Sequence, residues 1–504
     1  MSFLMKAVAL GAVLLLAACA SGGDDDNESA PSTSAAADTT VASTMPAVER
    51  PTGPTADVSE ELTGGRGVFI GTAIPGQLDP GYVEHEFVAA GTATAYTAAD
   101  ELTADGAWTL APSSEAEYRT RVLVRRPEDP ADFSGTVLVE WLNVSGGVDA
   151  DPDYVTTHEE IARQGHIWVG VSAQLIGVEG GPVFVRVEGP GTEVAGKGLK
   201  GIDPARYGSL MHPGDAFSFD IYTQVARALG EDEALLGGVK PAHIVALGES
   251  QSAFALVTYI NGVQPLTHAF DGFFVHSRGA AGLALVEPGE AADITDAIGR
   301  MPSIIRTDTD VPVFEFQTES DVTSVIGSLA VRQPDTDTFR LWEVAGTAHA
   351  DTRLVGDSAT YIDCGVPIND GPPHVVAKAA LRHLVTWITT GAAPPQAPLL
   401  EVNEASQQRR DADGIALGGV RTPPVSVPVR VLSSAQGPAG SVICLLLGST
   451  TTMPTDRIVT LHGTRPDFET QYAAAVDEAI AGGFVLEEDR AAIDAYAHPE
   501  LVPE

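Results

Sequence analysis

The sequence has few basic side chains for its length. Its 504 residues include 29 Lys and Arg against 68 Asp and Glu, which gives a formal net charge of −39 at pH 7. A nucleic-acid partner requires a basic face, and no cluster of Lys and Arg supplies one. The composition therefore argues against nucleic-acid binding, and an acidic surface of this kind favours solubility.

The sequence also lacks the common motifs of metal and nucleotide sites. It contains no H-E-x-x-H motif and no pair of Cys and His at ligand spacing. The segment GTEVAGKG, residues 191–198, nearly matches a phosphate-binding loop, but Gly198 follows Lys197 where a Ser or Thr hydroxyl would bind magnesium. We therefore expect no metal and no cofactor.

Long apolar runs are scarce, and one of them lies close to the first residue. Residues 7–18 follow a single cation, Lys6, and are too few to span a bilayer, but they have the layout of an export signal. The run ends in LAAC, which is similar to a bacterial lipobox, where the cysteine becomes lipidated. We expect a signal peptide over residues 1–18, attachment to a membrane through lipidated Cys19, and a location in the cell envelope, facing the periplasm or the exterior. An ordinary secretory signal cut near the same place is the alternative.

Cysteine is equally scarce, with three residues in the chain. The lipobox accounts for Cys19, which leaves Cys364 and Cys444 as an even pair in an oxidising compartment. We expect these two to form a disulfide. Two free buried thiols are the alternative.

Large apolar residues are nearly absent between residues 20 and 65, where Ser, Thr, Ala, Pro, Asp and Glu predominate. Such a segment buries too little surface to offset its ordering entropy, so we expect a disordered tether over residues 19–65. It holds nine acidic residues and one basic residue, so most of the negative charge belongs to the rest of the chain. Residues 66–504 are expected to form one domain with large insertions and a C-terminal extension from about residue 392.

From residue 119 onward, apolar segments typical of strands alternate with amphipathic segments typical of helices. This order predicts an α/β fold with a mostly parallel central sheet and helices on both faces. The first strand has period-two alternation and is expected at a sheet edge. The strands are predicted over residues 119–127, 135–143, 166–173, 243–248, 271–277, 311–321 and 338–346. The helices are predicted over residues 151–165, 215–230, 374–391 and 467–483, with residues 418–432 extended.

A serine, an acid and a histidine each lie at the end of one of these predicted strands or just after it. Ser250 lies in GESQS after the strand over residues 243–248, Asp321 comes directly after VPVFEFQTES at the end of a later strand, and His349 follows the next strand. A serine hydroxyl needs a base to take its proton, and the base needs an acid to orient it; the chain order Ser, Asp, His is that of the α/β-hydrolase fold. Two alternatives stay open: Ser250 as a simple helix cap, and Glu319 as the acid.

The turn at the serine departs from the G-x-S-x-G motif in one position. Gly248 fits, but Ser252 replaces the second glycine and is still small enough for a sharp turn between strand and helix. The oxyanion hole is expected to use the backbone N–H of Gln251 and a second N–H, from Asn143 or Val144, in the compact loop LNVSGGVD.

Several of these segments together resemble the bacterial α/β-hydrolase-domain proteins, a mostly uncharacterised family of about this length. They are EWLNVSGG, HPGDAFSFDIYTQ, LGESQSA, FQTESDV, AGTAHAD, CGVPIN and GGVRTP, and the resemblance extends from about residue 64 to the C-terminus. It implies an α/β-hydrolase fold and a serine hydrolase, with Ser250, Asp321 and His349 at the positions of the catalytic triad.

The pattern thus predicts an exported serine hydrolase that cleaves small carboxylic esters through an acyl-enzyme. Amide or lactone cleavage by the same triad is the first alternative, and an inactive binding lipoprotein with a hydrolase fold is the second. The irregular segments over residues 174–213 and 279–310 are expected to act as lid-like insertions that shape the substrate pocket.

Overall fold

The computed structural model describes residues 52–71, 78–186, 189, 191–298, 300–438 and 440–504. The predicted signal peptide, Cys19 and the tether as far as residue 51 lie outside these described residues. Within the described part of the chain, no helix combines the length and the apolar character needed to cross a bilayer.

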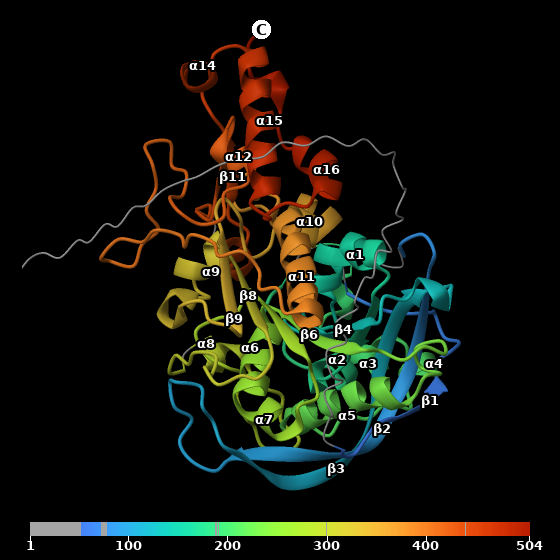
Figure 1. The fold of residues 1–504 in the computed structure, drawn as a ribbon. Coiled ribbons are helices and arrows are strands. Elements are labelled where there is room, and N and C mark those ends of the chain that lie inside the picture. Colours follow the sequence, from blue (N-terminus) through green and yellow to red (C-terminus); the bar gives the residue numbers. More distant parts are fainter. Residues whose placement is uncertain (1–51, 72–77, 187–188, 190, 299, 439) are drawn as a thin grey trace, which may run out of the picture. The chain divides into compact units, whose positions relative to one another are not determined.

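In the described residues, nine strands form one sheet in the order β1-β2-β3-β5-β4-β6-β7-β8-β9 (Figure 1). The first four strands in this order pair antiparallel, and every pair from β5 to β9 is parallel. The sheet is therefore mostly parallel, as predicted. The strands are β1 (Asp57–Glu61), β2 (Tyr82–Ala98), β3 (Leu110–Pro127), β4 (Thr136–Trp141), β5 (Ile167–Val171), β6 (His243–Glu249), β7 (Gly272–His276), β8 (Val313–Thr318) and β9 (Phe339–Val344).

The antiparallel side of the sheet corrects two predictions. The strand predicted at the sheet edge is part of β3, which lies between β2 and β5 and is not at the edge. β1 belongs to the sheet although its sequence, DVSEE, falls in the segment predicted as a tether, so the folded part begins before residue 66. Backbone pairing with β2 and burial of Val58 secure β1 in spite of its acidic composition.

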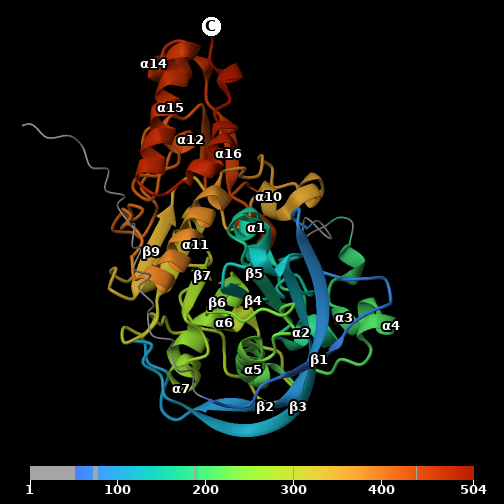
Figure 2. The ribbon, with the colours of Figure 1, turned by 45° about the vertical axis from the view of Figure 1, so that its right-hand side comes forward.

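Helices cover both faces of the sheet, as predicted (Figure 2). Alternation along β6 divides the core: Ile244 and Ala246 pack in the cluster that includes α5 and α6, and Val245 and Leu247 pack in the cluster that includes α1 and α11. Figure 2 also shows the long β2–β3 ribbon curving past α5 and α7. These helices are α1 (Pro152–Gln164), α5 (Ser218–Glu231), α6 (Gln251–Thr258), α7 (Gln264–Thr267) and α11 (Pro373–Thr390).

Shorter helices fill the insertions between the strands. Five of them lie in the connections, and their bounds are α2 (Leu175–Glu179), α3 (Gly198–Ile202), α4 (Pro204–Tyr207), α8 (Ile294–Ile298) and α9 (Glu319–Thr323). After β9 comes α10 (Thr352–Val355), which precedes the long helix α11.

The chain beyond α11 packs on the N-terminal end of that helix through an apolar cluster that includes Val375 and Phe468. Cys364 and Cys444 form a disulfide, which ties this part to the segment before α11. The stretch over residues 418–432, predicted as extended, contains a short helix because Pro423 and Pro424 lie in its first turn, where proline is favoured. The elements are α12 (Pro423–Ser426), β10 (Arg430–Ser433), α13 (Val442–Leu446), β11 (Ser449–Thr452), α14 (Thr455–His462), α15 (Arg465–Ala481) and α16 (Arg490–Asp494).

Candidate active site

Ser250 lies at the sharp turn between β6 and α6. Its backbone has φ 56° and ψ −120°, a strained conformation for a residue with a side chain. The turn brings strand and helix so close that a Cβ on Gly248 would lie 3.0 Å from the backbone oxygen of Ser252. Ser250 occupies the N-cap position of α6, but its side chain makes no capping hydrogen bond. The hydroxyl is therefore held at the turn for another partner.

That partner is His349, which follows β9. The Ser250 Oγ lies 2.8 Å from Nε2 of His349, and Nδ1 of the same ring lies 2.6 Å from Oδ1 of Asp321. All three side chains are buried, with exposed fractions of 8 % or less. In such a series the hydroxyl can pass its proton to the imidazole ring while the carboxylate holds the ring in place.

The charges of this pair favour a charged histidine. Burial acts to lower the pKa of His349, but the Asp321 carboxylate outweighs it and raises that pKa to about 9. Burial acts to raise the pKa of Asp321, yet the charge and hydrogen bond of His349, with the hydrogen bonds described next, lower it below its usual value. Asp321 is thus ionised at neutral pH and supports an imidazolium.

The second oxygen of Asp321 is held by neighbouring hydrogen bonds. Oδ2 accepts hydrogen bonds from the Ser277 hydroxyl at 2.6 Å and from the backbone N–H and hydroxyl of Thr318, both at 2.7 Å. The backbone N–H of His349 donates to the Ser320 hydroxyl at 2.6 Å. Residues at the ends of β7 and β8 therefore fix the orientation of the Asp321 carboxylate and the His349 ring. No sequence pattern singled out Ser277.

Glu319, the alternative acid, has other partners. Its Oε1 accepts from Arg410 at 2.6 Å and from the backbone N–H and hydroxyl of Ser434, and its Oε2 accepts from the backbone N–H of Gly346 at 2.6 Å. The structure thus brings Asp321 to His349 and directs Glu319 toward the C-terminal part of the chain.

The two loops expected to form the oxyanion hole lie together, with one correction. Gln251 begins α6, where backbone N–H groups have no partner within the helix. The N–H of Asn143 instead donates to the carbonyl of Ala150 at 2.9 Å, so it is committed to the loop. The N–H of Val144 donates to Oε1 of Gln251 at 3.3 Å, a long bond that a substrate oxygen can replace. Gln251 and Val144 are the remaining candidate donors.

Ser250 and His349 open into a cavity of about 490 Å³. Its walls are mainly apolar and come from four main places: the start of the described chain, the loop between β4 and α1, the insertion after β5, and α13 with the segment around α10. The apolar side chains include Val68, Phe69, Ile70, Val148, Val183, Val185, Val194, Leu354, Val355, Ile443 and Leu446. The site therefore offers an apolar surface beside the Ser250 hydroxyl and the His349 ring.

The two predicted lid segments differ in their relation to this cavity. The segment over residues 174–213 supplies part of its wall, but no described residue of the segment over 279–310 lines it. That second segment instead packs on the helix after the serine, where the Thr258 hydroxyl donates to the Leu283 carbonyl at 2.7 Å. Its predicted role in the pocket is wrong because local hydrogen bonds hold it against α6.

Comparison with known proteins agrees with this architecture. Residues 48–495 match the profile of the alpha/beta hydrolase domain family. The chain belongs to this family. The family and the fold predicted from the sequence are thereby confirmed. No curated protein matches the sequence.

Several solved structures are similar to this alpha/beta hydrolase. A fungal esterase from Rhizomucor miehei has 9 % identity over 62 % of this chain and 86 % of its own, with a TM-score of 0.32. A glucuronoyl esterase from Teredinibacter turnerae has 13 % identity over 58 % and 76 %, with a TM-score of 0.27. A serine hydrolase from Xanthomonas campestris has 12 % identity over 50 % and 83 %, with a TM-score of 0.24.

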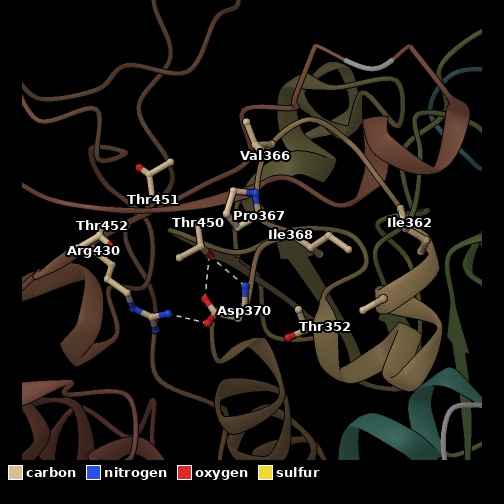
Figure 3. Close-up of a pocket in the computed structure, with 11 residues that line it drawn as sticks. Thr352, Ile362, Val366, Pro367, Ile368, Asp370, Arg430, Thr450, Thr451 and Thr452 are labelled. Carbon is tan, nitrogen blue, oxygen red and sulfur yellow. Dashed lines mark hydrogen bonds and ion pairs between the residues drawn. The ribbon is translucent and has the colours of Figure 1, made fainter.

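The hydrolase has a second hollow, of about 650 Å³, which shares no lining residue with the first. Figure 3 shows Asp370 between Arg430 and Thr450, to which it is joined at 2.6 and 2.7 Å. Its described lining residues include no histidine and no cysteine. Asp370, Arg430 and Thr450 of this hollow bind one another, and Ser250 and His349 belong to the other cavity.

Glu249 is a residue of the site that the sequence analysis did not single out. It is the last residue of β6, directly before Ser250, and its side chain is almost fully buried. Its Oε1 lies 3.5 Å from Nε2 of His349. Burial raises its pKa to about 7, although the nearby histidines His349 and His276 partly oppose this. Its position beside the nucleophile was visible in GESQS, but its proximity to His349 depends on the fold.

Proposed function

We propose that this alpha/beta hydrolase is a serine hydrolase that cleaves carboxylic esters through an acyl-enzyme. The observation that carries the proposal is the unbroken series of hydrogen bonds from Ser250 through His349 to Asp321, at the base of an apolar cavity. The strained turn adds support, because it holds the Ser250 hydroxyl away from the capping position and toward the base.

The reaction follows from the positions of these atoms. His349 Nε2 takes the proton of Ser250 as Oγ attacks the ester carbonyl, and Asp321 stabilises the imidazolium that forms. The backbone N–H groups of Gln251 and Val144 donate to the carbonyl oxygen as it gains negative charge. His349 then gives its proton to the departing alcohol, and a water molecule repeats these steps to release the acid.

The cavity supports an uncharged substrate with an apolar group. Its walls are mainly apolar, and the ionisable side chains that line it are Glu84, Arg186, Glu249 and His349, of which Arg186 is exposed. Glu84 is already paired with Arg125 at 2.8 Å. The net charge of −39 adds a repulsive field for anions. We infer that neutral esters of apolar acids or alcohols are preferred over anionic ones.

A panel of p-nitrophenyl esters with acyl chains of increasing length tests this function on the purified protein. We expect turnover that depends on Ser250, with Ser250→Ala lowering kcat by at least about 10³-fold. Ser252→Ala is a matched control, because Ser252 is buried two residues away and no described residue bonds its hydroxyl. Equal turnover by Ser250→Ala and the unmodified protein would refute the proposed function.

We also propose that the enzyme works in the cell envelope and is anchored by lipid at Cys19. The apolar run over residues 7–18 and the LAAC sequence support this, and a disulfide between Cys364 and Cys444 suits an oxidising compartment. Expression with a radiolabelled fatty acid provides the test. The full-length chain should incorporate label and the Cys19→Ala variant should not, and incorporation by both would exclude this anchor.

A further inference from the structure

A carboxylate lies on each side of the His349 ring. Asp321 bonds to Nδ1 at 2.6 Å, and Glu249 approaches Nε2, the nitrogen that exchanges the proton with Ser250, at 3.5 Å. At this distance Glu249 makes no strong hydrogen bond, so it acts on the ring through its charge. Both carboxylates are shielded from water, because the side chain of Glu249 is 5 % exposed and that of Asp321 is fully buried.

No strong hydrogen bond from another residue holds the Glu249 carboxyl, among the residues that the structure describes. No described residue donates a hydrogen bond to its Oε1. Its other oxygen is 3.5 Å from Nδ2 of Asn143, which also donates to the Glu249 backbone carbonyl at 3.0 Å. The side chain is therefore placed by the backbone of β6 and by Asn143, while the oxygen nearest His349 keeps its lone pairs available.

We propose that Glu249 is a positioning residue that acts as a second carboxylate for His349 and sets the pH at which this histidine becomes a general base. The inference rests on the proposed function, since it concerns the base of the same reaction. An ionised Glu249 stabilises the imidazolium formed when Ser250 gives up its proton. The same charge also keeps the resting histidine protonated to a higher pH. Glu249 therefore lowers activity at low pH and stabilises the imidazolium that forms during the reaction.

Other charged groups around Glu249 help to determine whether its carboxyl is ionised. His276 is on the neighbouring strand β7 and is paired with Asp153 of α1 at 2.8 Å. Among the groups that act on Glu249, His349 and His276 favour its ionised form, while Asp153 and Asp321 oppose it. Three more ionisable side chains line a small cavity of about 20 Å³ beside Glu249, His276 and His349. They are Asp351, Arg353 and His374.

With its pKa near 7, Glu249 changes charge in the range where the enzyme would work. Because the pKa of His349 is raised, its base form appears as the pH rises. Removing the charge of Glu249 should lower that pKa, since an opposite charge within about 4–6 Å shifts a pKa by roughly 1–3 units. The acidic limb of kcat/KM then moves to lower pH.

The test is the pH profile of kcat and kcat/KM for Glu249→Gln with a neutral p-nitrophenyl ester. We expect the acidic limb to move down by about 1 pH unit and kcat on the alkaline plateau to fall about tenfold, because one unit of pKa is a factor of ten in imidazolium stability. Glu401→Gln is the control, since it removes one negative charge from an exposed residue, and its profile should match that of the unmodified protein. The proposal would be overturned if the acidic limb of Glu249→Gln stayed at the same pH, or if kcat/KM fell by the same factor at every pH.

A second variant and a second measurement keep the outcome independent of folding and of turnover. Glu249→Asp keeps the charge but withdraws it from the ring, so a smaller downward shift is expected, and a shift as large as that of Glu249→Gln would count against a charge effect. NMR titration of the His349 ring protons in the Ser250→Ala protein, with and without Glu249→Gln, should show the same decrease in pKa. If no ester is cleaved, the proposed function fails, while this titration still decides whether Glu249 acts on His349; an unchanged titration overturns the inference.

Discussion

At the scale of the residue, the chemistry of the site depends on which carboxylate reaches which atom. Asp321 and Glu319 are two residues apart and both buried, yet only Asp321 reaches the His349 ring. Sequence order and strand spacing were enough to predict Ser250, Asp321 and His349 as a group. They did not predict Glu249 or Ser277, because these act through contacts between the ends of different strands.

A pair of acid variants separates these roles. Asp321→Asn should lower kcat by about 10³- to 10⁴-fold, because an amide no longer supports the imidazolium and can select the wrong tautomer of His349. Glu319→Gln should instead lower the melting temperature, since it weakens the ion pair between fully buried Glu319 and partly buried Arg410, and should leave the pH profile unchanged. Steady-state kinetics and thermal unfolding of both variants provide the measurement. A larger loss of kcat in Glu319→Gln would reverse the assignment of the acid.

The raised pKa of His349 predicts a dependence on pH. The ring accepts the proton of Ser250 only in its neutral form, which is populated as pH rises toward the pKa of about 9. We therefore expect kcat/KM to increase from pH 6 to pH 9 and to level off above that value. The profile should be measured with an ester whose own hydrolysis is subtracted. A plateau that begins below pH 7 would contradict the charged environment of His349.

At the scale of the element, the active site depends on parts that are distant along the chain. The parallel strands and their helices were predictable because apolar runs and amphipathic periods are local signals. The long ribbon of β2 and its partner β1 were missed, because small and acidic residues there gave no such signal. The contribution of α13 to the cavity was also not predictable, since it depends on the disulfide and on packing between distant segments.

The disulfide is predicted to support the substrate pocket. Cys444 lies in α13 between Ile443 and Leu446, which line the cavity, and its bond to Cys364 fixes this wall. Replacing both cysteines with serine should lower the free energy of unfolding, by up to about 4.5 kcal/mol in the chain-entropy model. It should raise KM for long-chain esters more than it lowers kcat. Urea unfolding and kinetics of the double variant test this, and unchanged KM values would show that α13 keeps its place without the bond.

At the scale of the whole molecule, the charge of the chain bears on which substrates approach. The excess of acidic side chains was evident from composition, and the structure adds that the cavity itself has mainly apolar walls, with Glu84, Glu249 and the exposed Arg186 among its lining. Composition alone could not connect the two, because the position of charge relative to the site depends on the fold. A neutral ester meets no electrostatic barrier, whereas an anionic ester is repelled at long range.

This difference predicts an effect of salt. For two esters that share an acyl chain, one with a neutral and one with an anionic leaving group, kcat/KM of the anionic ester should be the lower. Adding about 0.5 M NaCl should raise the value for the anionic ester several-fold, because it shortens the distance over which charges act from about 10 Å at 0.1 M salt to roughly 4 Å, and should leave the neutral ester nearly unchanged. Equal responses of the two esters would mean that surface charge does not influence entry to the cavity.

Covalent labelling reports whether Ser250 is an activated nucleophile. A fluorophosphonate probe should react with the purified protein, and peptide mass spectrometry should place the adduct on Ser250. Labelling should be lost in Ser250→Ala and strongly slowed in His349→Ala, because the hydroxyl then lacks its base. No labelling of the folded protein, or labelling that persists in Ser250→Ala, would show that Ser250 is not the nucleophile.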